Sequence, residues 1–193
     1  AMRASWYALL VLTLINSWHY LDRTVVSIVI EPIRKECMLT DGQLGLLTGM
    51  AYGLTFALAG LPLGYLVDRV NRRNLLVGLV VTWSGFTALA GFAQSFVHLL
   101  LARMGVGAAE AGGSPTSMSI IADLFPPKLR STAMGAFFLS MAIGGAISAF
   151  IGSYVAVHHG WRAAFFIAGI PGILCALLFL TTVKEPVRGA MDA

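Results

Sequence analysis

This sequence has few charged residues: only 11% of its 193 residues are Asp, Glu, Lys or Arg, while 58% are hydrophobic. A soluble domain carries about 25% charged residues, so this composition excludes an ordinary soluble protein. The hydrophobic residues also form several long blocks, which excludes a single buried core helix. We therefore predict an all-α membrane protein that crosses the bilayer several times.

Cysteine is scarce as well. The two cysteines, Cys37 and Cys175, fall in an expected loop and an expected apolar helix, so a disulfide framework is not implied. The net charge of +4 could suggest nucleic acid. However, Lys and Arg cluster in short turns between apolar blocks, which is typical of membrane topology signals, and we predict no nucleic-acid partner. The sequence contains no pattern for an enzyme, a metal site or a cofactor.

A membrane-spanning helix needs about 20 mainly apolar residues. Six such helices are predicted, over about 5–30, 42–67, 74–95, 97–124, 129–157 and 161–183. Thr40 and Gln43 have the spacing of a capping box at the start of the second helix. Pro126 and Pro127 end the fourth helix, because proline cannot continue the hydrogen-bond ladder.

Positive charge is unequally divided between the two sides of these helices. Three residues lie on one side: Arg34, Lys35 and Arg162. Eight lie on the other: Arg3, Arg69, Arg72, Arg73, Lys128, Arg130, Lys184 and Arg188. Because cytoplasmic loops carry the excess of Lys and Arg, we expect both termini in the cytoplasm and place the protein in a bacterial inner membrane.

Four ionisable residues interrupt the apolar helices: Asp22, Arg23, Arg103 and Glu110. A charge near the bilayer centre costs roughly 2.5–3.5 kcal/mol, so such residues usually face a bundle interior or an aqueous cavity and mark a path for ions or substrate. Arg103 and Glu110 share one helix face, two turns apart. One interpretation is a structural ion pair with other helices. The other is that Glu110 takes up and releases a proton as an arginine moves.

Polar residues accompany these charges. Asn16, His19 and Arg23 share one face of the first helix, whereas Asp22 points about 100° away. Together with Ser114 near the Glu110 face, Asn16 and His19 are predicted to line a cavity. Pairing of Arg23 with Glu110, or of Asp22 with Arg103, is left open, and His19 alone could be a packing residue.

Two helices carry small residues at every fourth position. The second helix has Gly45, Gly49 and Gly53, followed by Gly60 and Gly64, and the fifth has Ala136, Ser140, Gly144, Ser148 and Gly152. Such stripes let helix backbones approach closely in membranes. They predict either static packing or a sliding contact.

The turn after the second helix resembles the G-x-x-x-D-R-x-G-R-R signature of the major facilitator superfamily. The matching positions are Gly64, Asp68, Arg69, Asn71, Arg72 and Arg73. Asn71 replaces the second glycine, and Asn also tolerates a left-handed conformation. The resemblance implies a cytoplasmic gate motif in which charge-assisted hydrogen bonds around Asp68 hold neighbouring helix ends together. A plain positively charged loop is the alternative.

Further stretches extend this resemblance over essentially the whole chain, and it is most similar to spinster-like proteins. They are Leu21-Asp22-Arg23, residues 41–49 and residues 105–113. The resemblance implies a fold of twelve helices in two halves, each built from two three-helix inverted repeats. It implies that residues 1–193 are the amino-terminal six-helix domain and that a carboxy-terminal half is missing. A six-helix protein that pairs as a homodimer is the alternative.

The same resemblance assigns proton coupling and substrate gating to Asp22, Arg23, Arg103 and Glu110. The expected function is a proton-linked secondary transporter for an amphiphilic, lipid-like or organic anionic molecule. An anion:cation symporter of carboxylates or sugar acids is the nearest alternative. A non-transporting membrane scaffold or receptor is the alternative from another class.

Overall fold

The computed structural model describes residues 2–191, with the side chains of residues 152 and 153 outside that description. The helices are α1 (Met2–Ile28), α2 (Ile30–Cys37), α3 (Asp41–Gly45), α4 (Ala51–Val67), α5 (Arg72–Ala90), α6 (Phe96–Glu110), α7 (Gly113–Leu124), α8 (Pro127–Phe150), α9 (Ala156–His159) and α10 (Trp161–Thr182). Two π-helical turns, η1 (Leu46–Met50) and η2 (Ile151–Val155), join α3 to α4 and α8 to α9. Regular structure in the described range is therefore entirely helical, as predicted.

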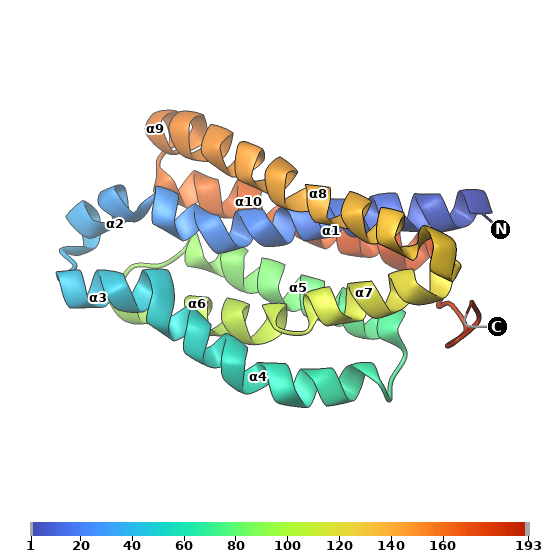
Figure 1. Ribbon diagram of the computed structural model, residues 1–193. Helices are drawn as coiled ribbons and strands as arrows, with labels where there is room; N and C mark the ends of the chain where they lie inside the picture. Colours follow the sequence, from blue (N-terminus) through green and yellow to red (C-terminus); the bar gives the residue numbers. More distant parts are fainter. Residues whose placement is uncertain (1, 192–193) are drawn as a thin grey trace.

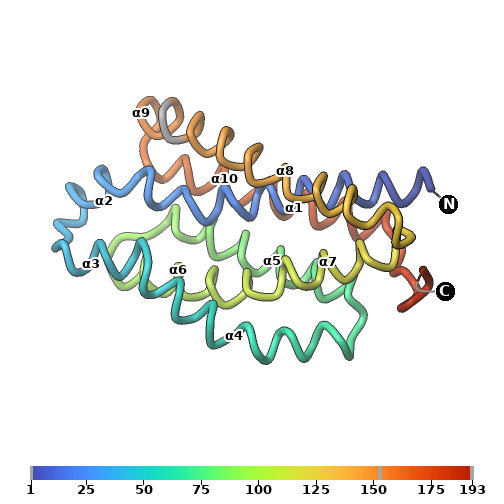
Figure 2. Tube along the Cα trace, viewed as in Figure 1, coloured from blue at the N-terminus to red at the C-terminus, as the bar shows by residue number. Residues whose placement is uncertain are grey.

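The long helices lie side by side in one bundle (Figure 1). Helix α1 packs against α8 and α10, α5 packs against α10 and α6, and α4 packs against α6. Helices α2, α3 and α9 lie at one end of the bundle, which we call the α2 end (Figure 2). Both chain termini and the α4–α5 turn lie at the opposite end, which we call the terminal end.

Local sequence explains where several helices begin. The capping box is confirmed, because the Gln43 N–H donates to Thr40 Oγ1 over 3.4 Å and the Thr40 N–H donates to Gln43 Oε1 over 3.0 Å. The sequence allowed a left-handed conformation at Asn71, but this residue is extended, with φ −64° and ψ 112°. Its side chain instead caps α5 by accepting the Asn74 N–H over 2.9 Å. Helix α8 starts at Pro127, before the expected boundary, because proline suits the first helical position.

The expected scheme of six regular spans is not exact. Four segments are long and apolar enough to cross a membrane: Asp41–Val67, Arg72–Ala90, Pro127–Phe150 and Trp161–Thr182. The helix expected over 97–124 is broken at Ala111–Gly112 into α6 and α7. Helix α1 is long enough, but polar residues such as His19 and Asp22 interrupt its apolar surface. The two exceptions are thus the segments that carry Asp22, Arg103 and Glu110.

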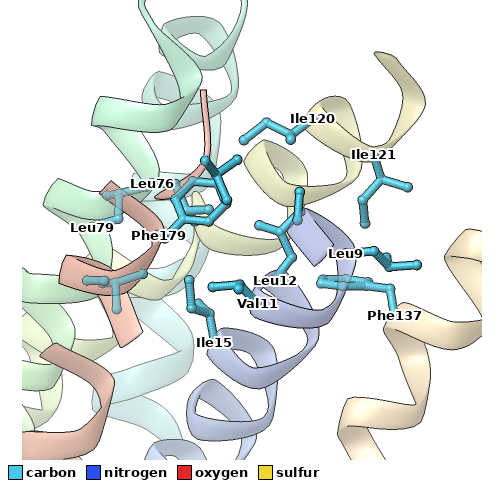
Figure 3. Packing of buried hydrophobic residues seen from close by; sticks show 14 of the residues in the cluster. Leu9, Val11, Leu12, Ile15, Leu76, Leu79, Ile120, Ile121, Phe137 and Phe179 are labelled. Carbon is cyan, nitrogen blue, oxygen red and sulfur yellow. The ribbon is translucent and has the colours of Figure 1, made fainter. Parts of the chain in front are cut away.

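Helix α1 supplies the centre of the core at the terminal end. Leu9, Leu12 and Ile15 are each at most 3% exposed and belong to a cluster that includes residues of six other helices. Figure 3 shows these side chains with their neighbours Leu76 and Leu79 of α5, Ile120 and Ile121 of α7, Phe137 of α8 and Phe179 of α10. Because lipid tails are as apolar as leucine, this packing is stabilised by close fit more than by exclusion of water.

The two small-residue stripes have different surroundings. The stripe of α8 packs against α1, where Gly144 lies against the Ser17 carbonyl and the Tyr20 side chain. Along the other stripe, a methyl group added at Gly45, Gly49 or Gly53 would meet no atom of the described residues within 4 Å. The expected close contact is therefore formed by the fifth predicted helix and not by the second within this chain.

Candidate functional site

The Glu110 carboxyl group is buried where three helices meet. Its residue is 1% exposed at the end of α6. The Tyr52 hydroxyl of α4 donates a 2.5 Å hydrogen bond to Glu110 Oε2. His19 Nε2 of α1 lies 3.2 Å from the same oxygen. Glu110 Oε1 has no hydrogen-bond partner among the described residues, so this carboxyl group is only partly satisfied.

A directional chain of hydrogen bonds orients His19. The Ser140 hydroxyl donates to the Phe137 carbonyl over 2.6 Å, which leaves its oxygen free to accept from Asn16 Nδ2 at 2.7 Å. Asn16 Oδ1 therefore faces His19 Nδ1 at 3.3 Å. An amide oxygen can only accept, so His19 Nδ1 must carry a hydrogen.

This orientation sets the chemistry between His19 and Glu110. With the hydrogen of neutral imidazole on Nδ1, Nε2 is an acceptor that faces Glu110 Oε2. A favourable contact then needs one further proton, either on Glu110 as a carboxylic acid or on His19 as imidazolium.

Arg103 binds backbone and not a carboxylate. Its Nε donates to the Leu47 carbonyl in η1 over 3.3 Å, and its terminal nitrogens donate to the carbonyls of Asp22 at 3.3 Å and Arg23 at 3.0 Å. The guanidinium also lies 4.9 Å from the centroid of the Tyr52 ring. Such π-helical turns are frequent at functional sites. Neither an Arg23–Glu110 nor an Asp22–Arg103 ion pair forms between the described side chains.

A cavity of about 350 Å³ opens beside this centre. Arg23 is exposed there, and its guanidinium lies 5.3 Å from the centroid of the Tyr52 ring. Tyr52 is also the residue whose hydroxyl binds Glu110. Arg103 lines the same cavity. The remaining lining residues are small, polar or aromatic: Thr24, Ser27, Thr48, Gly49, Gly53 and Phe56. Two cations therefore share one polar cavity in which an anion would be stabilised.

Asp22 faces a different hollow from its neighbour Arg23. Its side chain is completely buried, and both carboxyl oxygens lack hydrogen-bond partners among the described residues. The hollow has room for about 10 Å³ and is walled mainly by apolar residues of α1, α2, α5, α6 and α10. Arg103 lines both this hollow and the larger cavity. Two charges adjacent in sequence thus belong to separate compartments.

The residues predicted to line a cavity, Asn16, His19 and Ser114, line neither of the two hollows described above. Asn16 and His19 are buried in the hydrogen-bond chain that leads to Glu110. Ser114 is half-buried in the first turn of α7, beyond the break at Ala111–Gly112 that divides the predicted helix.

The residues of the signature turn separate into buried and exposed groups. Arg72 is 1% exposed and donates to Asp123 Oδ2 over 2.5 Å and to Glu185 Oε1 over 2.9 Å. The Arg73 N–H donates to Glu185 Oε2 over 2.7 Å. The acids that bind these arginines are therefore Asp123 and Glu185, whereas Asp68 is exposed.

The segment after α10 lies over the same turn. Arg188 donates to the carbonyls of Val67 and Val70, both over 2.7 Å, and the Gly189 N–H donates to Asp123 Oδ1 over 3.0 Å. Arg69 is exposed, and its guanidinium lies 4.1 Å from the Tyr65 ring centroid. Gly64 has open space around its α-carbon.

Sequence reasoning missed three residues of these sites: Tyr52, Asp123 and Glu185. Tyr52 lies between Gly49 and Gly53, where a large side chain with a polar tip stands out in a stripe of small residues. Asp123 and Glu185 are acids near helix ends, on the side of the bilayer where positive charge accumulates. Those positions could have suggested partners for the arginines of the turn.

Comparisons with known proteins agree with this architecture. The model of the Major Facilitator Superfamily matches residues 12–191. The chain is 31% identical over 191 residues to an MFS-type efflux pump of Mycolicibacterium smegmatis, covering 99% of this chain and 44% of the pump. It is 36% identical over 160 residues to a probable L-galactonate transporter of Escherichia coli, covering 82% of this chain and 35% of that protein.

A solved structure gives the same picture. It is the crystal structure of a bacterial homolog of the human lysosomal transporter spinster, in an inward-facing and unoccupied conformation. It superposes with a TM-score of 0.88 at 38% identity, over 96% of this chain and 44% of that chain. The chain therefore belongs to the Major Facilitator Superfamily and is similar to spinster proteins, and it spans less than half the length of these relatives. The family match indicates an integral membrane transporter fold and not an enzyme.

Proposed function

We propose that this chain is the amino-terminal half of a proton-coupled secondary transporter that works by alternating access. The share of the relatives' length that it spans, 44% for the efflux pump, supports a partner half of similar size. The stripe of open glycines, Gly45 of α3, Gly49 of η1 and Gly53 of α4, offers that half a surface for close helix approach. If the six-helix unit instead formed a homodimer, its second copy would have to form the opposite side of the substrate cavity.

The observation that carries the proposal is the contact of Glu110 with His19 and Tyr52. A buried carboxyl group that holds one proton with a histidine can exist in two arrangements of similar charge. Loss of that proton leaves a net negative charge in surroundings that penalise it. Arg23 and Arg103, both near the Tyr52 ring, are the cations that could move toward it. Protonation and arginine position are thereby coupled.

The substrate class follows from the cavity beside Glu110. The exposed Arg23 suits a phosphate or carboxylate, which arginine binds through paired hydrogen bonds. Arg103, which backbone carbonyls hold in place, adds a second positive charge to the same cavity. Its aromatic and small residues suit an apolar body attached to that headgroup. We therefore favour an amphiphilic organic anion as the substrate.

A sugar acid is the second candidate. The relative described as a probable L-galactonate transporter supports it, and a small carboxylate fits the same pair of arginines. A scaffold or receptor that transports nothing is the third candidate. It predicts that neutral substitutions of Asp22 or Glu110 leave function unchanged.

Flux into proteoliposomes containing the full-length gene product tests these candidates. Uptake of a labelled lysophospholipid driven by a pH gradient, with competition by sugar acids, separates the two substrate classes. We expect Glu110→Gln to abolish the dependence on the pH gradient while the protein stays folded. Transport that is independent of pH in the unmodified protein, and equally fast in Glu110→Gln, would reject proton coupling.

The proposed setting is a bacterial inner membrane with the terminal end in the cytoplasm. The arginines of the signature turn and both chain termini lie at that end, and such an excess of positive charge is typical of the cytoplasmic side. Protease accessibility of a tag placed at the amino terminus, in sealed cells and inverted vesicles, tests this orientation.

A further inference from the structure

Buried polar atoms without a hydrogen bond of ordinary geometry lie around Asp22 as well as at Glu110. Asp22 and Thr87 line the same hollow and lie close enough to interact, but neither the Asp22 oxygens nor the Thr87 hydroxyl makes such a bond with a described residue. Asp22 is 0% exposed and Thr87 is 3% exposed. Buried polar atoms of native proteins are nearly always satisfied by protein or by water, so this group calls for a ligand.

The size and chemistry of the hollow limit what that ligand can be. About 10 Å³ of space is roughly what one water molecule needs, and a buried water requires two to four polar partners. The two carboxyl oxygens of Asp22 and the Thr87 hydroxyl supply three. Arg103 is the other charged residue of the lining, but its guanidinium donates to the carbonyls of Leu47, Asp22 and Arg23. The remaining walls are apolar, so a larger polar molecule would find few partners there.

The hollow continues toward the α2 end, where α2 covers it. Its outer walls are Val26, Ala90, Leu99 and Phe165. Ile33 of α2 also lines the hollow and is completely buried, so α2 forms one of its walls. The larger cavity that contains Arg23 has a different lining, with Arg103 as the one residue common to both.

A clamp of polar contacts holds α2 in place. Glu36 Oε2 accepts the Trp161 indole N–H over 2.6 Å, and Glu36 Oε1 pairs with Arg162 at 2.7 Å. Arg162 also donates to the Ala93 carbonyl over 3.0 Å, in the connection between α5 and α6. The side chains of Glu36 and Arg162 are 48% and 39% exposed, and exposed pairs of this kind stabilise weakly.

From these observations we infer that Asp22 and Thr87 form a binding site for one water molecule, and that α2 is a lid over this site, held shut by the Glu36–Trp161–Arg162 clamp. Water and protons then reach Asp22 from the α2 end, by a route separate from the cavity that contains Arg23. The inference goes beyond the proposed function and does not depend on proton coupling through Glu110.

Thiol labelling tests the lid. In the full-length protein, reconstituted with Cys37→Ser, Cys175→Ser and any further cysteine replaced, Thr87→Cys reports access to the hollow. We expect a small charged methanethiosulfonate reagent to label Thr87→Cys at least tenfold faster when Glu36→Gln or Arg162→Gln is added. Lys35→Gln, a change of the neighbouring charge on the same helix, is the matched control and should leave the rate unchanged.

A second reporter separates lid opening from general loosening of the fold. Leu12→Cys replaces a fully buried core residue that lies outside the hollow, and it should stay unlabelled in every clamp variant. An unchanged Thr87→Cys rate in both clamp variants would overturn the lid, as would fast labelling with the clamp intact or parallel labelling of Leu12→Cys. A high-resolution structure of the full-length protein should show a water peak between Asp22 and Thr87, and an empty hollow would overturn the water site.

Discussion

The Tyr52 hydroxyl donates a 2.5 Å hydrogen bond to Glu110 Oε2, and this bond joins α4 to the end of α6. The same tyrosine ring lies near the guanidinium groups of Arg23 and Arg103. One side chain therefore touches both the group that we propose carries the proton and the cations that we propose bind the substrate. Loss of the hydroxyl should consequently affect coupling more than folding.

Replacement of Tyr52 by phenylalanine tests that relationship. Hydrogen bonds to charged groups contribute about 1.5–3 kcal/mol, so we expect flux driven by a pH gradient to fall about tenfold or more. Proteoliposome uptake measures the effect, with Tyr65→Phe as the control because Tyr65 is exposed against Arg69. Equal fluxes for Tyr52→Phe and the unmodified protein would contradict the assigned role.

Ser140 should act on transport only through His19. Ser140→Ala removes the acceptor that orients Asn16, so we expect slower proton-coupled flux. In a protein that already carries His19→Phe, the same change should have little further effect, because coupled residues are not additive. Ser148→Ala is the matched control, since Ser148 of the same helix binds Thr24 at 2.6 Å and not the histidine. If the losses of flux from Ser140→Ala and His19→Phe simply add in the double variant, Ser140 does not act through His19.

The network around Arg72 should dominate stability at the terminal end. Asp123→Asn removes the closest carboxylate of the buried Arg72 guanidinium but leaves Glu185 as a second one, so we expect a loss of about 1–3 kcal/mol. Asp68→Asn, in the same signature turn, should cost less than about 0.5 kcal/mol because Asp68 is exposed. Unfolding of the detergent-solubilised protein compares the two variants. A larger loss for Asp68→Asn would show that the family signature works here through its own acid.

Gly107 should tolerate no side chain where α6 crosses α4. An added methyl group would lie 2.6 Å from both the Tyr52 carbonyl and the Thr55 hydroxyl. We expect Gly107→Ala to cost about 1–3 kcal/mol and to weaken the Tyr52–Glu110 contact. Gly78→Ala is the control, because it would meet nothing within 4 Å and alanine favours a helix. A stability equal to that of Gly78→Ala would refute the close crossing.

The clamp at the α2 end should respond to acid. Hydrogen bonds from Trp161 and then from Arg162 lower the pKa of Glu36 below its ordinary value of 4.5. A lowered pKa means that the ionised clamp stabilises the fold above that ordinary value and is lost as pH falls through the lowered one. The thermal stability of Glu36→Gln should therefore be below that of the unmodified protein at pH 7, and the difference should vanish in strong acid. A constant difference across pH would contradict this titration.

Much of the fold could be predicted from sequence because helix formation in a membrane depends on local composition. The capping box at Thr40 and the helix boundary at the prolines near residue 126 were also confirmed, because both depend on residues close together in the sequence. The break at Ala111–Gly112 was missed, since glycines inside an apolar block do not by themselves show that a helix ends. Ser114 therefore lies in a separate helix, α7, and not on the continuous helix face from which its position was predicted.

The sequence by itself determined which side chains lipid would reject, because an ionisable residue inside an apolar block is costly to expose to hydrocarbon. Only the tertiary structure decided which residues each of these ionisable side chains contacts. Asp22 and Arg23 differ by about 100° around α1, so helix rotation sends them to different hollows. Glu110 found His19 and Tyr52, and Arg72 found Asp123 and Glu185, because helix packing brings together residues that are far apart along the chain.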